Sequence, residues 1–599
     1  RYADSNGFTI DSAREIWKYR EWVIDALNQD MPFDQFTIEQ IAGDMLPGAN
    51  LSQKIATGFH RNTLVNEEGG TDDEQFRVES IVDRVSTTSA VFLGLTLGCA
   101  QCHDHKYDPF SQREFYQLFS FFNGADEPKL EIPTKEQLEK GDWDLAKELR
   151  KQLADEEEKF DAQRKEFREA AAAWAALRTP EERKKLPEMV VVVLNMPLEK
   201  RGDEDWKYLT DHYQTIPEAA EKFPILKTMA DLRNRIPKFQ TTLVMQERAE
   251  PRETHVHIRG DFLRKGVAVE PVVPAVLHPL PKPESERKYN RLDLAKWLVT
   301  QENPLTARVT VNRYWQQLFG RGLVETENDF GSQGTPPSHP ELLDWLSAEF
   351  EQPTEMTGTS IDRPWGIKRM LRLIVCSATY RQSSRVRSDY LEKDPRNIFL
   401  SRQNRLRIPA EAIRDAALTA SGKLSRKIGG PSVFPPQPEG VFDLTQVNKG
   451  WKVSEGEDRY RRAIYTYLWR SSPYPGLTVF DFPEANVTCT RRNRSNTPLQ
   501  ALTLANDQVF LELSRGMAER LLTEGGADDG ARIDWIYRRS LSRLPTAEER
   551  GRLQAYVRQA RSLFERDQPG AVELLGGIPG EAATLTERAV WTSVCRAVM

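Results

Sequence analysis

Apolar residues recur at helical spacing through most of the chain. In the first part, Ile16, Trp22, Ile24 and Leu27 follow this spacing and predict a helix that buries one face. The same pattern predicts further helices over residues 33–41, 80–97, 115–122, 291–300, 308–319, 339–350, 367–376, 410–421 and 499–523. We therefore expect a mainly α fold.

Strand patterns are confined to the middle of the chain. Residues 189–194 form a short apolar run, residues 241–245 are rich in β-formers, and residues 254–258 alternate between two kinds of side chain. A proline-rich stretch over residues 269–283 follows and indicates a domain boundary. The sequence thus predicts a small β element between two helical parts.

A charged stretch from about residue 134 to residue 187 has a different pattern. Leu153, Phe160, Phe167 and Trp174 lie seven residues apart, with charged residues between them. This spacing predicts a helical arm or hairpin, which we interpret as a solvated structural insertion.

The chain of 599 residues is too long for a single core. We expect a mainly α, multidomain protein with a small β element in the middle. The predicted parts are a helical domain at 1–128, a helical arm at 129–187, a β-containing segment with a proline-rich linker at 188–285, and a helical domain at 286–599.

Composition limits the classes of partner. The formal net charge of −6 gives no indication of a phosphate-backbone partner, so we expect no nucleic acid. Since no stretch approaches about 18 uninterrupted apolar residues, we expect no membrane span.

The strongest chemical signal is a C-x-x-C-H run with Cys99, Cys102 and His103 at its fixed positions. This run is typical of c-type haem attachment, where two thiols add to the haem vinyl groups and the imidazole becomes an axial iron ligand. With 5 Cys and 8 His in the chain, chance predicts only about 6 × 10⁻⁴ such runs. The run therefore predicts covalent haem c.

Zinc is an open alternative to haem, and a second metal ion could bind beside either of them. Cys99 and Cys102, with one or both of His103 and His105, could instead bind zinc, although a structural zinc site usually draws on a second ligand pair that this chain lacks. A second metal ion such as calcium could bind the nearby acidic residues, whose alternative interpretation is a solvated acidic loop. They are Asp104, Asp108, Glu67, Glu68, Asp72, Asp73 and Glu74.

The sequence leaves several candidates for the second axial ligand of such a haem. His60 is the main candidate, with a hydrogen-bonded structural histidine as the alternative interpretation, and Met31 and Met45 are weaker candidates. His105 is too close to His103 in sequence to reach the opposite haem face easily. We expect it to support His103 instead.

Two groups of polar side chains in the second half suit a carbohydrate or an anionic substrate. Guanidinium and amide donors bind carboxylates, sulfates and sugar hydroxyls, and an aromatic ring can lie against a sugar ring. The alternative is that they are buried networks that fix domain geometry. The candidates are Arg308, Asn312, Arg313 and Trp315 in one group, and Arg491, Arg492, Arg494 and Asn496 in the other.

Long strings of residues resemble the planctomycete cytochrome C family and the planctomycete-specific domain that usually follows it. In the first part these strings are 58–62 (GFHRN), 68–70 (EGG), 93–96 (LGLT) and 99–109 (CAQCHDHKYDP). In the second part they are 303–309 (NPLTARV), 312–315 (NRYW), 319–324 (FGRGLV), 377–383 (SATYRQS) and 493–502 (NRSNTPLQAL).

The resemblance implies a periplasmic or otherwise exported c-type haem protein. Such proteins often carry a further cytochrome c domain before this region. The printed sequence starts without an initiator Met or a signal peptide, so we expect it to be a fragment or processed form.

Two functions follow as hypotheses. In the first, the protein transfers electrons or acts as an oxidoreductase, on carbohydrate-derived substrates or with a redox partner protein or cytochrome c domain. In the second, it is a non-redox structural or surface-binding protein with zinc or another metal at the C-x-x-C-H run.

Overall fold

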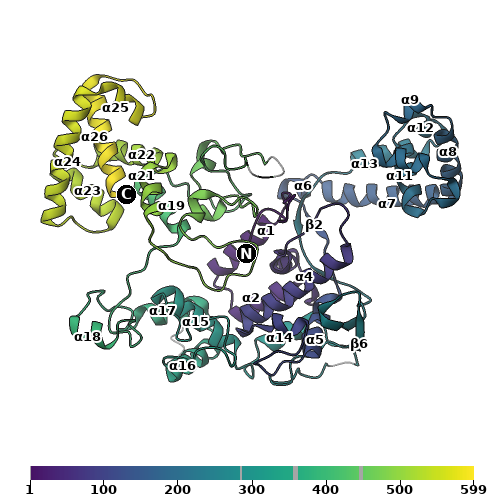
Figure 1. Cartoon of the computed structure of the whole chain (residues 1–599), viewed down its shortest axis with the longest axis horizontal. Coiled ribbons are helices and arrows are strands. Elements are labelled where there is room, and N and C mark those ends of the chain that lie inside the picture. Colours follow the sequence, from purple (N-terminus) through teal and green to yellow (C-terminus); the bar gives the residue numbers. More distant parts are fainter. Residues whose placement is uncertain (1, 284–285, 355–361, 444, 446–448) are drawn as a thin grey trace. The chain divides into compact units, whose positions relative to one another are not determined.

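The computed structural model describes residues 2–283, 286–354, 362–443, 445 and 449–599. Over these residues the chain forms 26 α-helices and six strands of two to five residues, which confirms the mainly α prediction (Figure 1). The contacts divide the chain into two compact units. One consists of Arg1–Lys129 with Thr242–Met599, and the other is Leu130–Thr241.

The first region of the larger unit is a helical layer around an aromatic core. Its helices are α1 (Trp17–Asn28), α2 (Phe33–Ala42), α3 (Leu51–Ala56), α4 (Asp73–Thr88) and α5 (Gln112–Asn123), with short turns η1 (Gly43–Met45), η2 (Thr57–Arg61) and η4 (Leu97–Gln101). Helix α5 begins with a capping box between Ser111 and Glu114. Its apolar face buries Phe115, Phe119 and Phe122, so α5 is central to this core.

The helix predicted over residues 80–97 starts and ends earlier than expected. Helix α4 begins at Asp73 because the Asp72 carboxylate accepts hydrogen bonds from the backbone N–H groups of Glu74 and Gln75. A π-helical turn, η3 (Ser89–Leu93), follows α4 and stops at Gly94, which has a φ of +60°. The C-x-x-C-H run therefore lies on a separate turn rather than at the end of a long helix.

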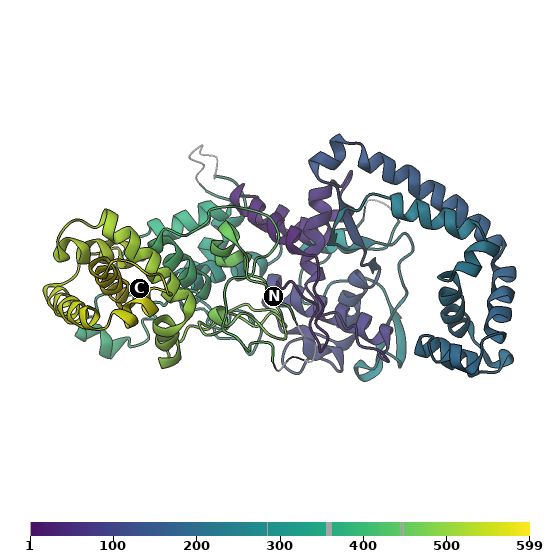
Figure 2. The ribbon, with the colours of Figure 1, turned by 90° about the horizontal axis from the view of Figure 1, so that it is seen from above.

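From residue 290 on, the regular elements of the larger unit are helices, as predicted, and long irregular stretches connect some of them. Its helices are α14 (Arg291–Leu298), α15 (Thr306–Phe319), α16 (Pro340–Glu351), α17 (Ile367–Cys376), α18 (Ser388–Lys393), α19 (Ala410–Ser421), α20 (Pro475–Thr478), α21 (Pro498–Asn506), α22 (Gln508–Glu524), α23 (Asp529–Leu541), α24 (Ala547–Arg566), α25 (Gln568–Leu574) and α26 (Ala582–Val598), with turns η7 (Gly456–Tyr460) and η8 (Ala463–Tyr465). Helices α24 and α26 lie side by side near the C-terminus (yellow in Figures 1 and 2).

The prediction of one helix over residues 499–523 is wrong. The chain breaks at Asp507, whose backbone is extended (φ −66°, ψ 135°), and the Asp507 side chain then caps α22 by accepting from the Val509 N–H at 2.8 Å. Apolar spacing runs through the break, so periodicity alone did not separate α21 from α22.

The small β element consists of short antiparallel pairs. Strand β1 (Ala125–Asp126) pairs with β4 (Gln246–Glu247), and β5 (Thr254–His257) pairs with β6 (Lys265–Val269) around the turn η6 (Ile258–Gly260). Strands β2 (Lys129–Ile132) and β3 (Gln240–Leu243) complete the set. The strand predictions near residues 241–245 and 254–258 are confirmed.

The smaller unit is entirely helical between its terminal strands, over the residues described. It contains α6 (Lys135–Glu139), α7 (Asp142–Ala162), α8 (Arg164–Ala176), α9 (Pro180–Arg183), α10 (Glu188–Asn195), α11 (Asp203–Gln214), α12 (Pro217–Lys222) and α13 (Ile225–Arg235), with the turn η5 (Leu198–Lys200). Helices α7 and α13 run side by side (Figures 1 and 2). The residues predicted to form the helical arm are helical, and the compact unit that contains them continues to Thr241. Phe160 and Phe167 meet at the bend between α7 and α8, with ring centroids 5.0 Å apart.

The prediction of a strand over residues 189–194 is wrong, because these residues form most of α10. Val190, Val193 and Leu194 are buried at helical spacing, whereas Met189 and Val192 are about half exposed. A short apolar run is compatible with either a strand or a buried helix. Here packing against the neighbouring helices favours the helix. Valine disfavours helix only slightly, so this burial outweighs it.

Buried charged side chains connect the first region of the larger unit to its second half. The Arg291 guanidinium, at the start of α14, is fully buried and donates to the carboxylates of Asp44 (2.7 Å) and Glu247 (3.0 Å) and to the Ile41 carbonyl oxygen. The Lys449 ammonium is likewise buried beside the Asp11 carboxylate, at 3.3 Å. Because unpaired buried charges are strongly unfavourable, these contacts tie the two parts together.

Candidate functional site

The C-x-x-C-H run lies on the 3-10 turn η4 and the loop that leads into α5. Leu97 and Ala100 point into the aromatic core, while Cys99, Cys102 and His103 are exposed to solvent. Neither thiol of the run is in a disulfide. The turn is therefore anchored by its apolar residues and presents its three reactive side chains outward.

The His103 ring has a defined hydrogen bond. Its Nδ1 lies 2.7 Å from the carbonyl oxygen of Asp104, a contact that requires a proton on Nδ1. The lone pair of the ring is then on Nε2, the atom that would bind a metal. In metal-bound histidines, the N–H of the second ring nitrogen commonly donates a hydrogen bond to a backbone carbonyl in this way. Two free thiols and an imidazole of this tautomer fit covalent haem.

Two side chains of α5 hold the backbone of the run. The carbonyl oxygen of Gln101 accepts from Gln112 Nε2 at 2.9 Å and from the Tyr116 hydroxyl at 3.1 Å. Gln112 Nε2 also donates to the His257 carbonyl oxygen, at 3.1 Å. Burial raises the pKa of the Tyr116 hydroxyl, and the nearby Cys102 raises it further, so Tyr116 stays a proton donor.

The β5–β6 hairpin forms a wall of this site that sequence reasoning missed. Gly260 has a φ of +77°, and a Cβ placed on it would lie 2.7 Å from the Cys102 sulfur. The glycine therefore allows the hairpin to approach the thiol. Its only sequence signal was a glycine between two strand-like segments, and nothing in the sequence linked that turn to Cys102.

His257, on the same hairpin, was also missed. Its ring is buried, with centroid distances of 4.8 Å to Tyr116 and 5.8 Å to Phe119, and burial lowers its pKa. It is thus a neutral ring packed on α5 beside the run, and the alternating pattern of residues 254–258 was its only signal.

A Gly260→Ala variant tests the hairpin wall. Both the positive φ and the 2.7 Å contact disfavour the added methyl group, so we expect the Cys102 side chain or the hairpin to shift and make the exposed thiol more accessible. Alkylation by iodoacetamide should become about twofold or more faster at Cys102 relative to Cys99. Peptide mass spectrometry measures both rates. Gly70→Ala is the matched control, since Gly70 has a φ of +80° with no atom within 4 Å, and unchanged Cys102 labelling in Gly260→Ala would contradict the contact.

His105 and Asp108 connect the loop after the run to the second half of the larger unit through hydrogen bonds. His105 Nδ1 accepts from the Asp108 N–H at 2.9 Å, and the buried Asp108 carboxylate accepts from the Ser332 N–H at 2.7 Å. His105 thus fixes the loop that follows His103.

The acidic residues near the run have separate partners. Asp72 caps α4, Glu74 pairs with Arg77 at 2.6 Å, and Asp104 accepts from the Gln112 N–H. In the part of the chain that the structure describes, no group of three or more His, Cys, Asp or Glu side chains is arranged to hold a metal ion. Glu67, Glu68 and Asp73 also lie in the loop before α4 or in its first turn.

The structure does not bring His60 together with the run. Its ring is buried between Phe59 and Phe122, with centroid distances of 4.7 and 4.8 Å. Phe122 lies six positions beyond Tyr116 on α5, or about 9 Å further along the axis at 1.5 Å per residue. His60 is therefore near the opposite end of α5 from Cys102, and its placement does not support a role as the second axial ligand.

A buried ion cluster lies beside His60 and predicts a pH dependence. Burial alone would raise the pKa of Glu127, but the charges of Arg84 and Arg61 lower it to about 2. A depressed carboxyl pKa stabilises the fold above the unfolded value near 4.5, and this contribution is lost as the pH falls towards 2.

We expect the Glu127 group to contribute at most about 3 kcal/mol to the free energy of unfolding, lost between about pH 5 and pH 2. Urea denaturation of the wild type and Glu127→Gln across this range measures it. The variant should be less stable at pH 7 and less sensitive to pH. Glu548→Gln, in an exposed pair with Arg552, is the control, and equal pH slopes for Glu127→Gln and the wild type would refute the assignment.

The first group of predicted substrate residues is mostly internal. Asn312 is fully buried and bonds both the N–H and the carbonyl oxygen of Val324, and Trp315 is buried against Phe319. Arg313 donates to the carbonyl oxygens of Ala90 and Val91, in the π-helical turn before the run. Arg308 pairs with Asp344 at 2.8 Å. The structure therefore does not place these side chains around a common cavity.

The second group separates into different surroundings. Arg491 is exposed and lines a polar pocket of about 280 Å³ with Arg321, Arg396 and Glu325. Arg492 binds Glu411 at the edge of another cavity. Arg494 is half-buried, and burial lowers its pKa, while Asn496 is exposed. Arg491 and Arg492 therefore line two different cavities.

These observations define a mainly α, multidomain chain with an exposed C-x-x-C-H turn. Residues 1–127 match the family model PSCyt2, described as a protein of unknown function (DUF1549), and residues 290–557 match PSD1, described as a protein of unknown function (DUF1553). Both families are associated with planctomycete cytochrome c-like proteins. No curated protein and no solved structure matches the chain. None of the described helices is long and apolar enough to cross a membrane.

Proposed function

We propose that this chain is an exported c-type haem protein that transfers electrons or acts as an oxidoreductase. The observation that supports it most is the turn η4, where two unpaired thiols and an imidazole with its proton on Nδ1 project to solvent from an anchored backbone. Cys99 and Cys102 would hold the haem, and His103 Nε2 would bind its iron.

The residues around the run have distinct parts in this proposal. Bound haem would supply one-electron exchange. Gln112 and Tyr116 fix the carbonyl group between the two cysteines, so the spacing of the thiols is held by α5. Asp104 holds His103 in the required tautomer. The exposure of the run leaves room for a redox partner protein or a cytochrome c domain.

The substrate class is also part of the proposal. A carbohydrate-derived or anionic substrate would bind most readily at the polar pocket of Arg491, where Arg321 and Arg396 already bind one carboxylate, that of Glu325, at 2.5 and 2.7 Å. Arg308, Asn312, Arg313 and Trp315 do not enter the proposal, since they serve structural contacts.

A pyridine haemochrome spectrum tests the proposal. The chain is expressed behind an added export signal in a host that matures c-type cytochromes, and the haem band and the intact mass are measured after acid-acetone extraction. We expect a band that survives extraction and a mass increased by one haem. A bare-chain mass would overturn the proposal. One zinc and no iron per chain would favour the structural alternative.

A further inference from the structure

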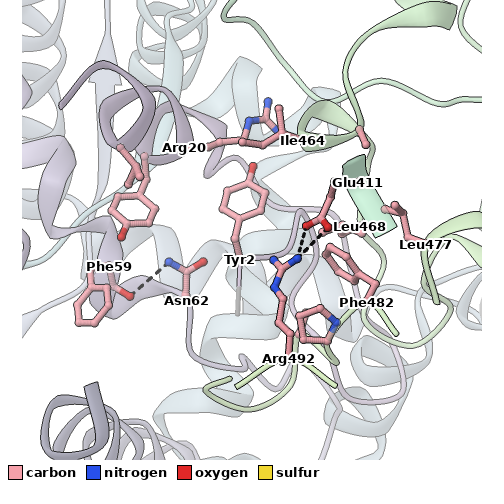
Figure 3. A pocket seen from close by; sticks show the side chains of 15 residues that line it. Tyr2, Arg20, Phe59, Asn62, Glu411, Ile464, Leu468, Leu477, Phe482 and Arg492 are labelled. Carbon is pink, nitrogen blue, oxygen red and sulfur yellow. Dashed lines mark hydrogen bonds and ion pairs between the residues drawn. The ribbon is translucent and has the colours of Figure 1, made fainter. Parts of the chain in front are cut away.

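A second site lies in the larger unit, in a cavity of about 390 Å³ (Figure 3). Both segments of the larger unit, residues 1–129 and 242–599, contribute side chains to the wall of this cavity. Figure 3 shows Phe59 and Asn62 on one side, Glu411 and Arg492 on the other, and the Tyr2 ring between them. The residues that line it are Tyr2, Tyr19, Arg20, Val23, Phe59, Asn62, Glu411, Ala463, Ile464, Leu468, Leu477, Phe482, Pro483, Ala485 and Arg492.

The body of the cavity is apolar and aromatic. Its size lies within the range of about 300–1,000 Å³ typical of small-molecule sites, and most of its wall comes from aliphatic and aromatic side chains. The hydroxyl of Tyr19 is bound to Gln40 (2.6 Å) and that of Tyr2 to Asp4 (2.7 Å), so these rings present their carbon faces. A flat apolar molecule fits such a wall.

The polar part of the wall carries an excess of positive charge. One nitrogen of Arg492, Nη1, donates to both carboxylate oxygens of Glu411, at 2.7 and 2.8 Å. The guanidinium also lies 5.6 Å from the centroid of the Phe482 ring. Among the described residues, Nε and Nη2 of Arg492 make no hydrogen bond. They remain available to an acceptor on a bound molecule.

Arg20 adds a second guanidinium to the wall. Its Nη1 and Nη2 donate to the Ser432 hydroxyl and the Gly430 carbonyl oxygen, at 2.7 and 2.9 Å. Its Nε is buried and has no hydrogen-bond partner within the described part of the chain. Two guanidinium groups and one carboxylate give the lining a net charge of +1, which favours an anion.

We propose that this cavity binds a small aromatic monoanion, with its rings against Tyr19, Phe59 and Phe482 and its acidic group at Arg492. The site is separate from the C-x-x-C-H turn and does not depend on haem. Its test therefore uses the purified chain in any state of maturation.

Two fluorescent probes separate the contribution of the rings from that of the charge. 1-Anilinonaphthalene-8-sulfonate has the aromatic rings and a sulfonate, and N-phenyl-1-naphthylamine has the same rings without the sulfonate. We expect both to bind in a 1:1 ratio, measured by fluorescence titration. Failure of the sulfonate to bind in this ratio would overturn the proposal.

Charge variants at the rim give opposite expected effects. Arg492→Gln should weaken sulfonate binding about tenfold, because a charge-assisted hydrogen bond is lost. Glu411→Gln should strengthen it several-fold, because Arg492 is released from its carboxylate. Binding of the neutral probe should change less than twofold in both. Equal responses of the two probes would overturn the assignment of the acidic group to Arg492.

A filling variant tests the position of the rings. Ala485 lines the cavity and is half-buried, so Ala485→Trp should occupy the space and weaken both probes more than tenfold. Far-UV circular dichroism checks that this variant folds, and the two rim variants decide the question if it does not. Arg552→Gln, in an exposed ion pair on α24, is the control. Undiminished binding to a folded Ala485→Trp chain would refute the site.

Discussion

A chain with both Cys99→Ser and Cys102→Ser should carry no covalent haem after maturation in a host that attaches it to the wild type. Each thioether bond needs a thiol, and the only C-x-x-C pair of the sequence is this one. The expected effect is complete: the intact mass equals that of the polypeptide, and the haemochrome band is lost on acid-acetone extraction.

The other cysteines provide the controls. Cys376 and Cys489 are also outside disulfides, so Cys376→Ser and Cys489→Ser should keep the band and the added mass. His103→Ala separates attachment from ligation: the thiols remain, and the visible spectrum should change because the axial ligand is lost. An extraction-resistant band in the double serine variant would contradict the proposed attachment.

Arg291→Met should destabilise the larger unit by about 3–5 kcal/mol. The methionine leaves the Asp44 and Glu247 carboxylates without the guanidinium that now binds both. Burial already raises the pKa of Glu247, and loss of the Arg291 charge should raise it further. The lost stability should be partly recovered at acidic pH, where Glu247 can take up a proton.

Hydrogen exchange locates this effect within the unit. Amides of α2, η1 and α14 should exchange faster in Arg291→Met, since the guanidinium also holds the Ile41 carbonyl. Arg552→Met removes an exposed arginine of α24 and should change the free energy of unfolding by less than about 0.5 kcal/mol. Similar urea midpoints for Arg291→Met and the wild type would show that the buried ion cluster contributes little.

Much of the helical architecture followed from local patterns. The apolar face of α5 is complete within its own twelve residues, and its capping box is also local, so sequence spacing was sufficient to predict it. The same holds for β5, whose alternation predicted a strand. By contrast, residues 189–194 were ambiguous, since a run of valines satisfies either period.

The residues of the candidate site also fall into those that local sequence patterns identified and those that they did not. Cys99, Cys102 and His103 were identified because their chemistry depends on spacing along the chain. Gly260 and His257 could not be, because they are more than 150 positions away from the run and meet it only through the β5–β6 hairpin. His60 is close to the run in sequence, yet it packs at the other end of α5.

The sequence by itself determined the helical class, the helices of the arm and the C-x-x-C-H run, because each depends on contacts or spacings within a few residues. Only the tertiary structure decided which residues surround the C-x-x-C-H run and which arginines make internal structural hydrogen bonds. It also decided where the cavity beside Arg492 lies. The sequence assigned Arg313 and Arg492 the same role, as candidate substrate-binding residues. In the structure, Arg313 donates to the carbonyl groups of a π-helical turn, whereas Arg492 lines a cavity. The difference comes from burial and from partners distant in sequence, which local patterns do not encode.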